Sequence, residues 1–454
     1  MAGKINVNFV NEYEEFLREY VLPLIGIDTD TDNLVLERHE QYLNEQVPTM
    51  EQQDERLYFN VSGWRVFSIP CQMKIPPDVM SCVRRILQSF PDVSQYKKTG
   101  ASRYLPTNFP YEVQKKSLYR NLVQEGLCQW LAGDIKNNSI RELFDELETW
   151  SVKTYEGKKV TMGFVINLDA TSTFGVGNQK WLHFMHDDAS AMLTDCIHSV
   201  IELDVKCNFI SYHSLSENGQ IEACKLDHNA PLRFLPIMQK YVDGKVNGVF
   251  LLGNGDIVLA KNQKVRFVKR NLRWLNMSYS TFENALEKFV RKNKDEGSEG
   301  KIEELIKSIF ASVLDVSFSH AGGIIAVVGK TWPDTDNNSI LAPCDDLLNV
   351  SYDMEAMAED IRTLKRAVIL EMVENKTFQE MDRKLRSELL GLDGACILNC
   401  EGKVHSFGAI IQNDSGAIGG GEQRQRNYRN MVLLSRFLQM DTLMFLLKAS
   451  AFIQ

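Results

Sequence analysis

The sequence lacks closely spaced cysteine pairs. Its nine cysteines are scattered, and none of them form a CxxC pair. Zinc ribbons and thiol redox sites are usually built on such pairs, so the sequence indicates neither kind of site. The cysteines are Cys71, Cys82, Cys128, Cys196, Cys207, Cys224, Cys344, Cys396 and Cys400.

Long apolar runs are also missing. The longest, such as GGIIAVVG at 322–329, fall far short of the roughly 20 residues that a membrane-spanning helix needs. The first residues, MAGKINVNFVNEYEEF, hold no apolar core of a secretory signal. We therefore expect a cytoplasmic protein that does not use a membrane as a partner.

An excess of positive charge is absent as well. The chain has 51 Lys and Arg against 60 Asp and Glu, a formal net charge of −9. A broad electrostatic grip on a nucleic-acid backbone normally requires a basic surface, so a long nucleic acid is not an expected partner. Net charge says little about one cleft, so a local basic pocket for a small phosphorylated ligand stays open.

The length and composition predict several globular domains of the α/β class. A chain of 454 residues with 44% hydrophobic residues is expected to form roughly two or three domains. The charged stretch RKNKDEGSEGK at 291–301 contains no apolar residue and predicts a boundary. We predict an N-terminal helical and β domain at 1–155, a middle α/β module at 156–290 and a third domain at 300–454.

Hydrophobic periodicity predicts the elements of the first two regions. Residues 10–50 and 111–150 have helical spacing, and the alternating aromatic and β-branched run 57–75 predicts a hairpin or sheet edge. In the middle module we expect a strand at 159–169, then a helix at 190–204. A further strand, CNFISYHSL, follows, and then a hairpin at 248–268 that turns at GNGD.

The third region alternates helices with short buried strands. A helix is expected at 302–318, a strand in GGIIAVV, and two amphipathic helices at 357–375 and 378–392. The strands DGACILNC and VHSFGAIIQ follow, then a glycine-rich loop and a last helix around NMVLLSRFL. This alternation is typical of a mixed sheet flanked by helices.

Residues 391–435 carry the candidate chemistry. Asp393 and Gly394 precede a buried strand, where Gly394 and Ala395 would leave room for a ligand and the Asp393 carboxylate could bind a metal. The loop GAIGGGE, with Gly420 and Gly421, could cradle phosphates through its backbone N–H groups. Guanidinium groups that suit phosphate oxygens follow in Arg424, Arg426 and Arg429.

These motifs resemble the nucleotide-binding domain of diadenylate cyclases of the DisA type, over about residues 300–454. Asp393-Gly394-Ala395 matches the family's DGA motif, and the strand with Gly322 and Gly323 is similar to its glycine-containing strand. The second motif, G-x-R-H-R-A-A, is altered. When Leu434-Ser435 is aligned with the family's Leu-Ser, only Arg429 matches the Arg-His-Arg segment, and Arg436 stands where the family usually has an acid.

The resemblance implies a function and its partners. It implies a nucleotidyltransferase that joins nucleoside triphosphates into a cyclic or linear signalling dinucleotide, with Mg²⁺ or Mn²⁺ bound at Asp393 as the catalytic residue. Because the family sets two active sites face to face, a homodimer or higher oligomer is expected. Such a second messenger would fit bacterial stress response or antiviral defence. The alternative is a catalytically silent nucleotide sensor that relays to an effector protein.

Simpler interpretations of the same residues remain open. Asp393-Gly394 could form an ordinary turn, and the glycine-rich loop could be only a surface loop. His183 and His186 are spaced to share a helix face but match no established metal motif. The basic cluster Lys264, Arg266, Lys269, Arg270 and Arg273 is more often a solvated sheet face than a binding platform.

Overall fold

The computed structural model has a mixed α/β architecture and divides into two compact units. The first unit consists of residues 1–220 and 236–281, and the second of 221–235 and 282–454. The structure describes residues 7–27, 35–44, 46–71, 73–99, 111–133, 138–172, 184–215, 228, 230–277, 286–287, 290–291, 299–319, 324–328, 368, 371–373, 376–392, 395–409 and 431–436.

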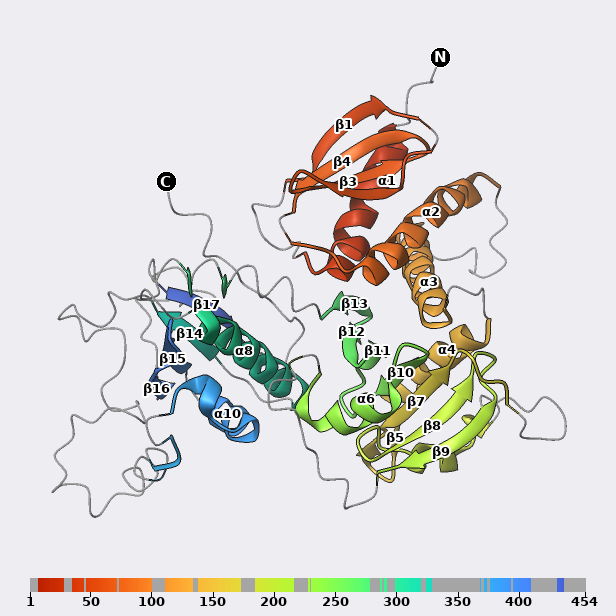
Figure 1. Cartoon of the computed structure of the whole chain (residues 1–454). Helices are drawn as coiled ribbons and strands as arrows, with labels where there is room; N and C mark the ends of the chain where they lie inside the picture. The colour runs from red at the N-terminus through yellow and green to blue at the C-terminus, as the bar shows by residue number, and fades with distance from the viewer. Residues whose placement is uncertain are drawn as a thin grey trace. The chain divides into compact units, whose positions relative to one another are not determined.

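The first unit opens with helices and a small antiparallel sheet in the order β1-β4-β3-β2 (Figure 1). The predicted helix ends early, and 37–42 is a strand paired with β4. The helical elements are α1 (Val7–Phe16), the π-helix η1 (Leu17–Val21), the 3-10 helix η2 (Pro23–Ile25) and α2 (Pro77–Thr99). The strands are β1 (Glu37–Tyr42), β2 (Met50–Gln53), β3 (Arg56–Val61) and β4 (Trp64–Pro70), and β3 and β4 confirm the predicted hairpin.

A seven-stranded sheet in the order β13-β12-β11-β10-β7-β8-β9 completes the first unit. The helices are α3 (Tyr111–Leu131), α4 (Asn138–Val152) and α6 (Leu235–Tyr241), with the 3-10 helix η3 (Asp188–Met192); the 3-10 helix η4 (Leu232–Phe234), which directly precedes α6, belongs to the second unit. The strands are β7 (Met162–Asn167), β8 (Ser199–Asp204), β9 (Phe209–Ser214), β10 (Val246–Leu251), β11 (Ile257–Lys261), β12 (Lys264–Arg270) and β13 (Arg273–Asn276); β5 (Thr154–Tyr155) and β6 (Lys158–Lys159) pair separately.

The hairpin prediction for this sheet is confirmed, and one helix prediction is wrong. Strands β10 and β11 pair antiparallel around the predicted GNGD turn, in which Gly255 has a φ of +88° that favours glycine. The helix predicted at 190–204 is instead a short 3-10 turn followed by β8, which pairs parallel with β7. Its residues SVIELD suit either period, and pairing with a buried strand decides the outcome.

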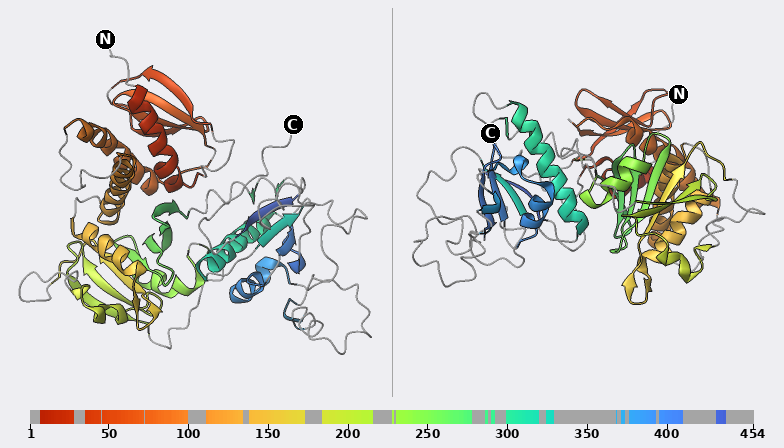
Figure 2. Two further views of the ribbon diagram at one scale, coloured as in Figure 1. Left: turned by 180° about the vertical axis from the view of Figure 1, so that it is seen from behind. Right: turned by 60° about the horizontal axis from the view of Figure 1, so that its bottom comes forward.

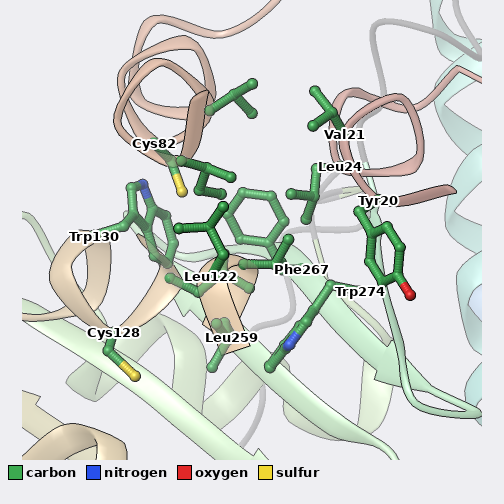
Figure 3. Close-up of a cluster of buried hydrophobic side chains, with 14 of the residues drawn as sticks. Tyr20, Val21, Leu24, Cys82, Leu122, Cys128, Trp130, Leu259, Phe267 and Trp274 are labelled. Carbon is green, nitrogen blue, oxygen red and sulfur yellow. The ribbon is translucent and has the colours of Figure 1, made fainter. Parts of the chain in front are cut away.

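Aromatic and aliphatic side chains from both parts of the first unit form its core. Phe16 stacks on Phe90 at 4.8 Å between ring centroids. Trp130 meets Phe267 edge to face at 5.0 Å, so α3 is joined to β12 (Figure 3). Helices α2 and α3 approach closely at Gly126, where an added Cβ would lie 2.2 Å from Cγ1 of Ile86. This close approach explains a glycine in mid-helix, which otherwise weakens a helix.

The second unit is built around a four-stranded mixed sheet in the order β16-β15-β14-β17. Helices α8 and α10 pack against each other, and α10 also contacts β15 and β16 (Figure 2). The elements are α8 (Glu299–Ser319), β14 (Ile324–Val328), the 3-10 helix η6 (Phe378–Glu380), α10 (Arg383–Leu390), β15 (Ala395–Asn399), β16 (Val404–Ala409) and β17 (Met431–Arg436). The predicted helix at 302–318 and the predicted strands β14, β15 and β16 are confirmed, whereas the helix predicted at 378–392 is divided into the 3-10 turn η6 and the shorter helix α10.

Candidate functional site

Two parallel strands form the centre of the second unit. Strand β14 pairs parallel with β15 in register, from Ile324 beside Ala395 to Val328 beside Asn399. Ala395 is fully buried. Both strands therefore begin at the same edge of the sheet, and Ala395 is the first residue of one of them. That edge is the candidate site.

Most of the predicted site residues fall outside the part of the chain that the structure describes. Ala395 is the one member of the predicted set within the described residues. The others lie outside them, namely Gly322, Gly323, Asp393, Gly394, Gly420, Gly421, Arg424, Arg426 and Arg429.

Strand β17 follows the predicted phosphate-binding residues Arg424, Arg426 and Arg429 in the sequence. Strand β17 is antiparallel to β14, with Met431 beside Val328 and Arg436 beside Ile324. It therefore begins at the opposite edge of the sheet from Ala395 and ends at the same edge. The helix predicted around NMVLLSRFL is wrong for 431–436, because this apolar run pairs with a buried strand instead of following helical periodicity. The described strands do not bring the start of β17 to the edge with Ala395.

A buried ion pair fixes the helices beside this sheet. Arg383 at the start of α10 donates from Nε to Oδ2 of Asp315 on α8 at 2.7 Å, and from a terminal nitrogen to Oδ1 at 2.8 Å. Both side chains are 5% exposed. The same groups bind the backbone of 230–232, since Leu232 N donates to Asp315 at 2.6 Å and Arg383 donates to Ala230 O at 2.7 Å.

A second arginine on α10 is buried without such a partner. Arg386 is 2% exposed, and its guanidinium donates to the carbonyl of Phe378 at 3.5 Å. No carboxylate lies within ion-pair distance of it among the described residues, and its Nε has no hydrogen-bond acceptor there. The pKa of Arg386 is lowered to about 10, mainly because the guanidinium is buried and to a smaller extent because of the positive charge of Arg383.

A polar cluster on the seven-stranded sheet was not predicted. Ser211 Oγ lies 2.9 Å from His213 Nε2, and that nitrogen lies 2.7 Å from Glu202 Oε2. Hydrogen bonds from Asn167, His213 and Ser211 outweigh the effect of burial and lower the pKa of Glu202. Because the hydroxyl and the carboxylate share one ring nitrogen, this arrangement cannot relay a proton through the ring to activate Ser211.

Clusters of metal-binding side chains are not found in the described part of the chain. Within the described ranges, no group of three or more His, Cys, Asp or Glu side chains could hold a metal ion. His186 is exposed and has Glu146 as its acidic neighbour, with Nδ1 3.5 Å from Oε1. His183 and Asp393 are not among these residues.

None of the helices in the described part of the chain is long and apolar enough to span a membrane. Comparison with protein-family models, with curated proteins and with solved structures finds no match to this chain.

Proposed function

We propose that residues 300–454 form a nucleotide-binding domain of the diadenylate-cyclase type that joins nucleoside triphosphates into a signalling dinucleotide. The observation that supports this most is the pairing of Ile324 with Ala395 at the start of two parallel strands. In the sequence, each strand directly follows one of the glycine-containing segments that resemble the family, HAGG and DGA. Small residues at the start of both strands would let the backbone come close to a ligand.

The proposed roles follow the chemistry of the side chains. The Asp393 carboxylate would hold Mg²⁺ or Mn²⁺, which offsets phosphate charge when bound. Backbone N–H groups at Gly420 and Gly421, together with Arg424, Arg426 and Arg429, would bind the phosphates. Holding two nucleotides in this way would favour, by proximity and orientation, attack of the 3′-hydroxyl of one on the α-phosphate of the other, in which the bond to the β-phosphate breaks and pyrophosphate leaves. A homodimer or higher oligomer would supply the second nucleotide.

One observation favours the second candidate function, a sensor that binds a nucleotide without turnover and relays this to an effector protein. Strand β17 begins beside Val328, at the edge of the sheet away from Ala395. Only Arg429 matches the phosphate motif of the family. A domain that keeps the DGA segment but has an altered phosphate segment could retain binding while losing the alignment that catalysis needs.

To test both candidates, the purified full-length chain is incubated with each NTP and dNTP in the presence of Mg²⁺ or Mn²⁺. The products are then analysed by mass spectrometry. A new dinucleotide supports the transferase. Tight binding measured by calorimetry without product supports the sensor. Neither product nor binding with any nucleotide would overturn both candidates.

A further inference from the structure

A pocket in the first unit, separate from the proposed nucleotide site, has the features of a binding site. It is an open hollow on the surface, and its empty space is about 310 Å³ when the solvent at its mouth is included. It is lined by side chains from η1, α3 and the β12–β13 hairpin, namely Glu19, Tyr20, Arg120, Val123, Gln124, Lys269, Leu272, Arg273 and Trp274.

The walls of the pocket are held together by buried contacts. Asn276 at the end of β13 donates from Nδ2 to the carbonyl of Leu24 in η2 at 2.9 Å. Lys269 on β12 donates to Oε1 of Gln124 on α3 at 3.2 Å and forms an ion pair with Glu148 on α4. The pocket is therefore formed within one folded unit, by elements that are tied to one another.

The cations of the hairpin differ in how they are paired. Arg266 lies 3.3 Å from Asp78, Lys269 pairs with Glu148, and Arg270 makes two hydrogen bonds to Oδ2 of Asp256. These three belong to the predicted basic cluster, and their charge is offset by acids. Arg273 is exposed and makes no ion pair within the described ranges.

A second unpaired cation comes from α3. Arg120 is exposed, lines the pocket with Arg273, and hydrogen-bonds the hydroxyl of Tyr20. It too makes no ion pair among the described residues. The acid among the lining residues is Glu19. Lys269 also lines the pocket but is paired with Glu148, so among the described residues the lining has two cations without an ion pair and one acid.

Aromatic surfaces complete the pocket. Tyr20 and Trp274 are both buried and lie close to each other at the margin of the core cluster (Figure 3). Tyr20 is fixed by Phe16 and Tyr119, with ring centroids 5.9 and 5.8 Å away. The indole Nε1 of Trp274 is buried and has no hydrogen-bond partner in the part of the chain that the structure describes. Buried indole N–H groups usually have a partner.

We propose that this pocket binds a small organic phosphate, with the phosphate held by Arg120 and Arg273 and its planar or apolar part against Tyr20 and Trp274. Guanidinium forks suit phosphate oxygens, and aromatic side chains at a pocket wall bind flat groups. The chain as a whole carries a net charge of −9, so the charge that these two arginines bring to the pocket is opposite in sign to that of the whole chain.

To test this proposal, the binding of phenyl phosphate and of inorganic phosphate to the full-length chain is measured by calorimetry at low ionic strength. Phenyl phosphate is expected to bind more tightly than inorganic phosphate. Arg120→Gln and Arg273→Gln are each expected to weaken phenyl phosphate binding about tenfold, the lower range for a charged hydrogen bond because both groups are exposed. Glu19→Gln is expected to strengthen it.

Two control variants show whether the ligand occupies this pocket or another part of the chain. Arg38→Gln removes an exposed arginine on β1 and should leave the affinity unchanged. Arg429→Ala alters the proposed nucleotide site and shows whether phenyl phosphate binds there instead. Loss of binding in Arg429→Ala with retention in Arg120→Gln and Arg273→Gln would place the ligand elsewhere and overturn the inference. Absence of binding by the unmodified chain would overturn it as well, without bearing on the proposed nucleotide site.

Discussion

Asp315 on α8 and Arg383 on α10 form a two-point ion pair that also binds the backbone of Ala230 and Leu232. Nearly all of both side chains is removed from water, so neither charge can be solvated if the other is lost. The pair therefore joins three segments that are distant in the sequence.

Removing one partner of this pair should destabilise the protein strongly. Asp315→Ala removes the carboxylate that binds the buried Arg383 guanidinium at two points, which costs about 3–5 kcal/mol in the free energy of unfolding. Urea denaturation of the full chain measures this change. The double variant Asp315→Leu/Arg383→Met removes both charges and should recover much of the loss.

A matched control lies on the same helix. Lys384 and Glu388 are exposed, with Nζ 3.9 Å from Oε1. Exposed pairs of this kind contribute roughly 0–1 kcal/mol, so Glu388→Gln should change stability little. Equal effects of Asp315→Ala and Glu388→Gln would contradict the role given to the buried pair.

The proposed nucleotidyltransferase activity should depend on the carboxylate of Asp393. Asp393→Asn should abolish dinucleotide formation, because the neutral amide is a poor ligand for Mg²⁺ or Mn²⁺. Product analysis by mass spectrometry measures this, and the thermal midpoint should stay the same. Asp54→Asn, in the β2–β3 turn, is the control for the same chemical change. Full turnover in Asp393→Asn would exclude this carboxylate as the catalytic metal ligand.

Arg429 is the residue that matches the phosphate motif of the family. Arg429→Ala should weaken triphosphate binding by about 1.5–3 kcal/mol, the usual cost of a lost charged hydrogen bond. Arg429→Lys should restore only part, since an ammonium group cannot form a bidentate contact. Titration with a non-hydrolysable triphosphate measures both. Smaller losses are expected for Arg424→Ala and Arg426→Ala, and unchanged affinity in all of these variants would show that this segment does not bind phosphate.

Asp195 should titrate well below a normal carboxyl group. Burial raises its pKa, but hydrogen bonds from the His198 side chain and from the backbone N–H groups of Ile197, His198 and Ser199 lower it to about 2. A depressed pKa means that these contacts stabilise the fold above about pH 4 and that this contribution is lost as the pH falls toward 2. Carboxyl resonances followed by NMR between pH 5 and 2 give the midpoint, and a midpoint near 4 would contradict the predicted network.

Periodicity and turn chemistry predicted much of the fold. The β10–β11 hairpin follows from its GNGD turn, and α8 and β14 follow from hydrophobic spacing. Strands β8 and β17 were predicted as helices, because short apolar runs suit both periods and only their pairing with β7 and β14 selects the strand. The pairing partner is not visible in a local window.

Burial of polar side chains was the least predictable feature of the sites. Arg383 and Arg386 lie in a helix with an amphipathic pattern, where charged residues normally face solvent, yet both are buried. The hairpin cations looked alike in the sequence, and only the acids supplied by α2, α4 and the β10–β11 turn distinguish Arg266, Lys269 and Arg270 from Arg273. Of the predicted nucleotide site, the structure describes Ala395.

Residues 221–235 belong to the second unit, although the chain returns to the first unit after them. The chain passes from one unit to the other after residue 220, again after 235 and again after 281. A cut within 291–301 would therefore yield a C-terminal fragment without Ala230 and Leu232, the backbone partners of Asp315 and Arg383. Such a fragment should regain stability when a synthetic peptide spanning 221–235 is added, so the two pieces would behave as a complementing pair.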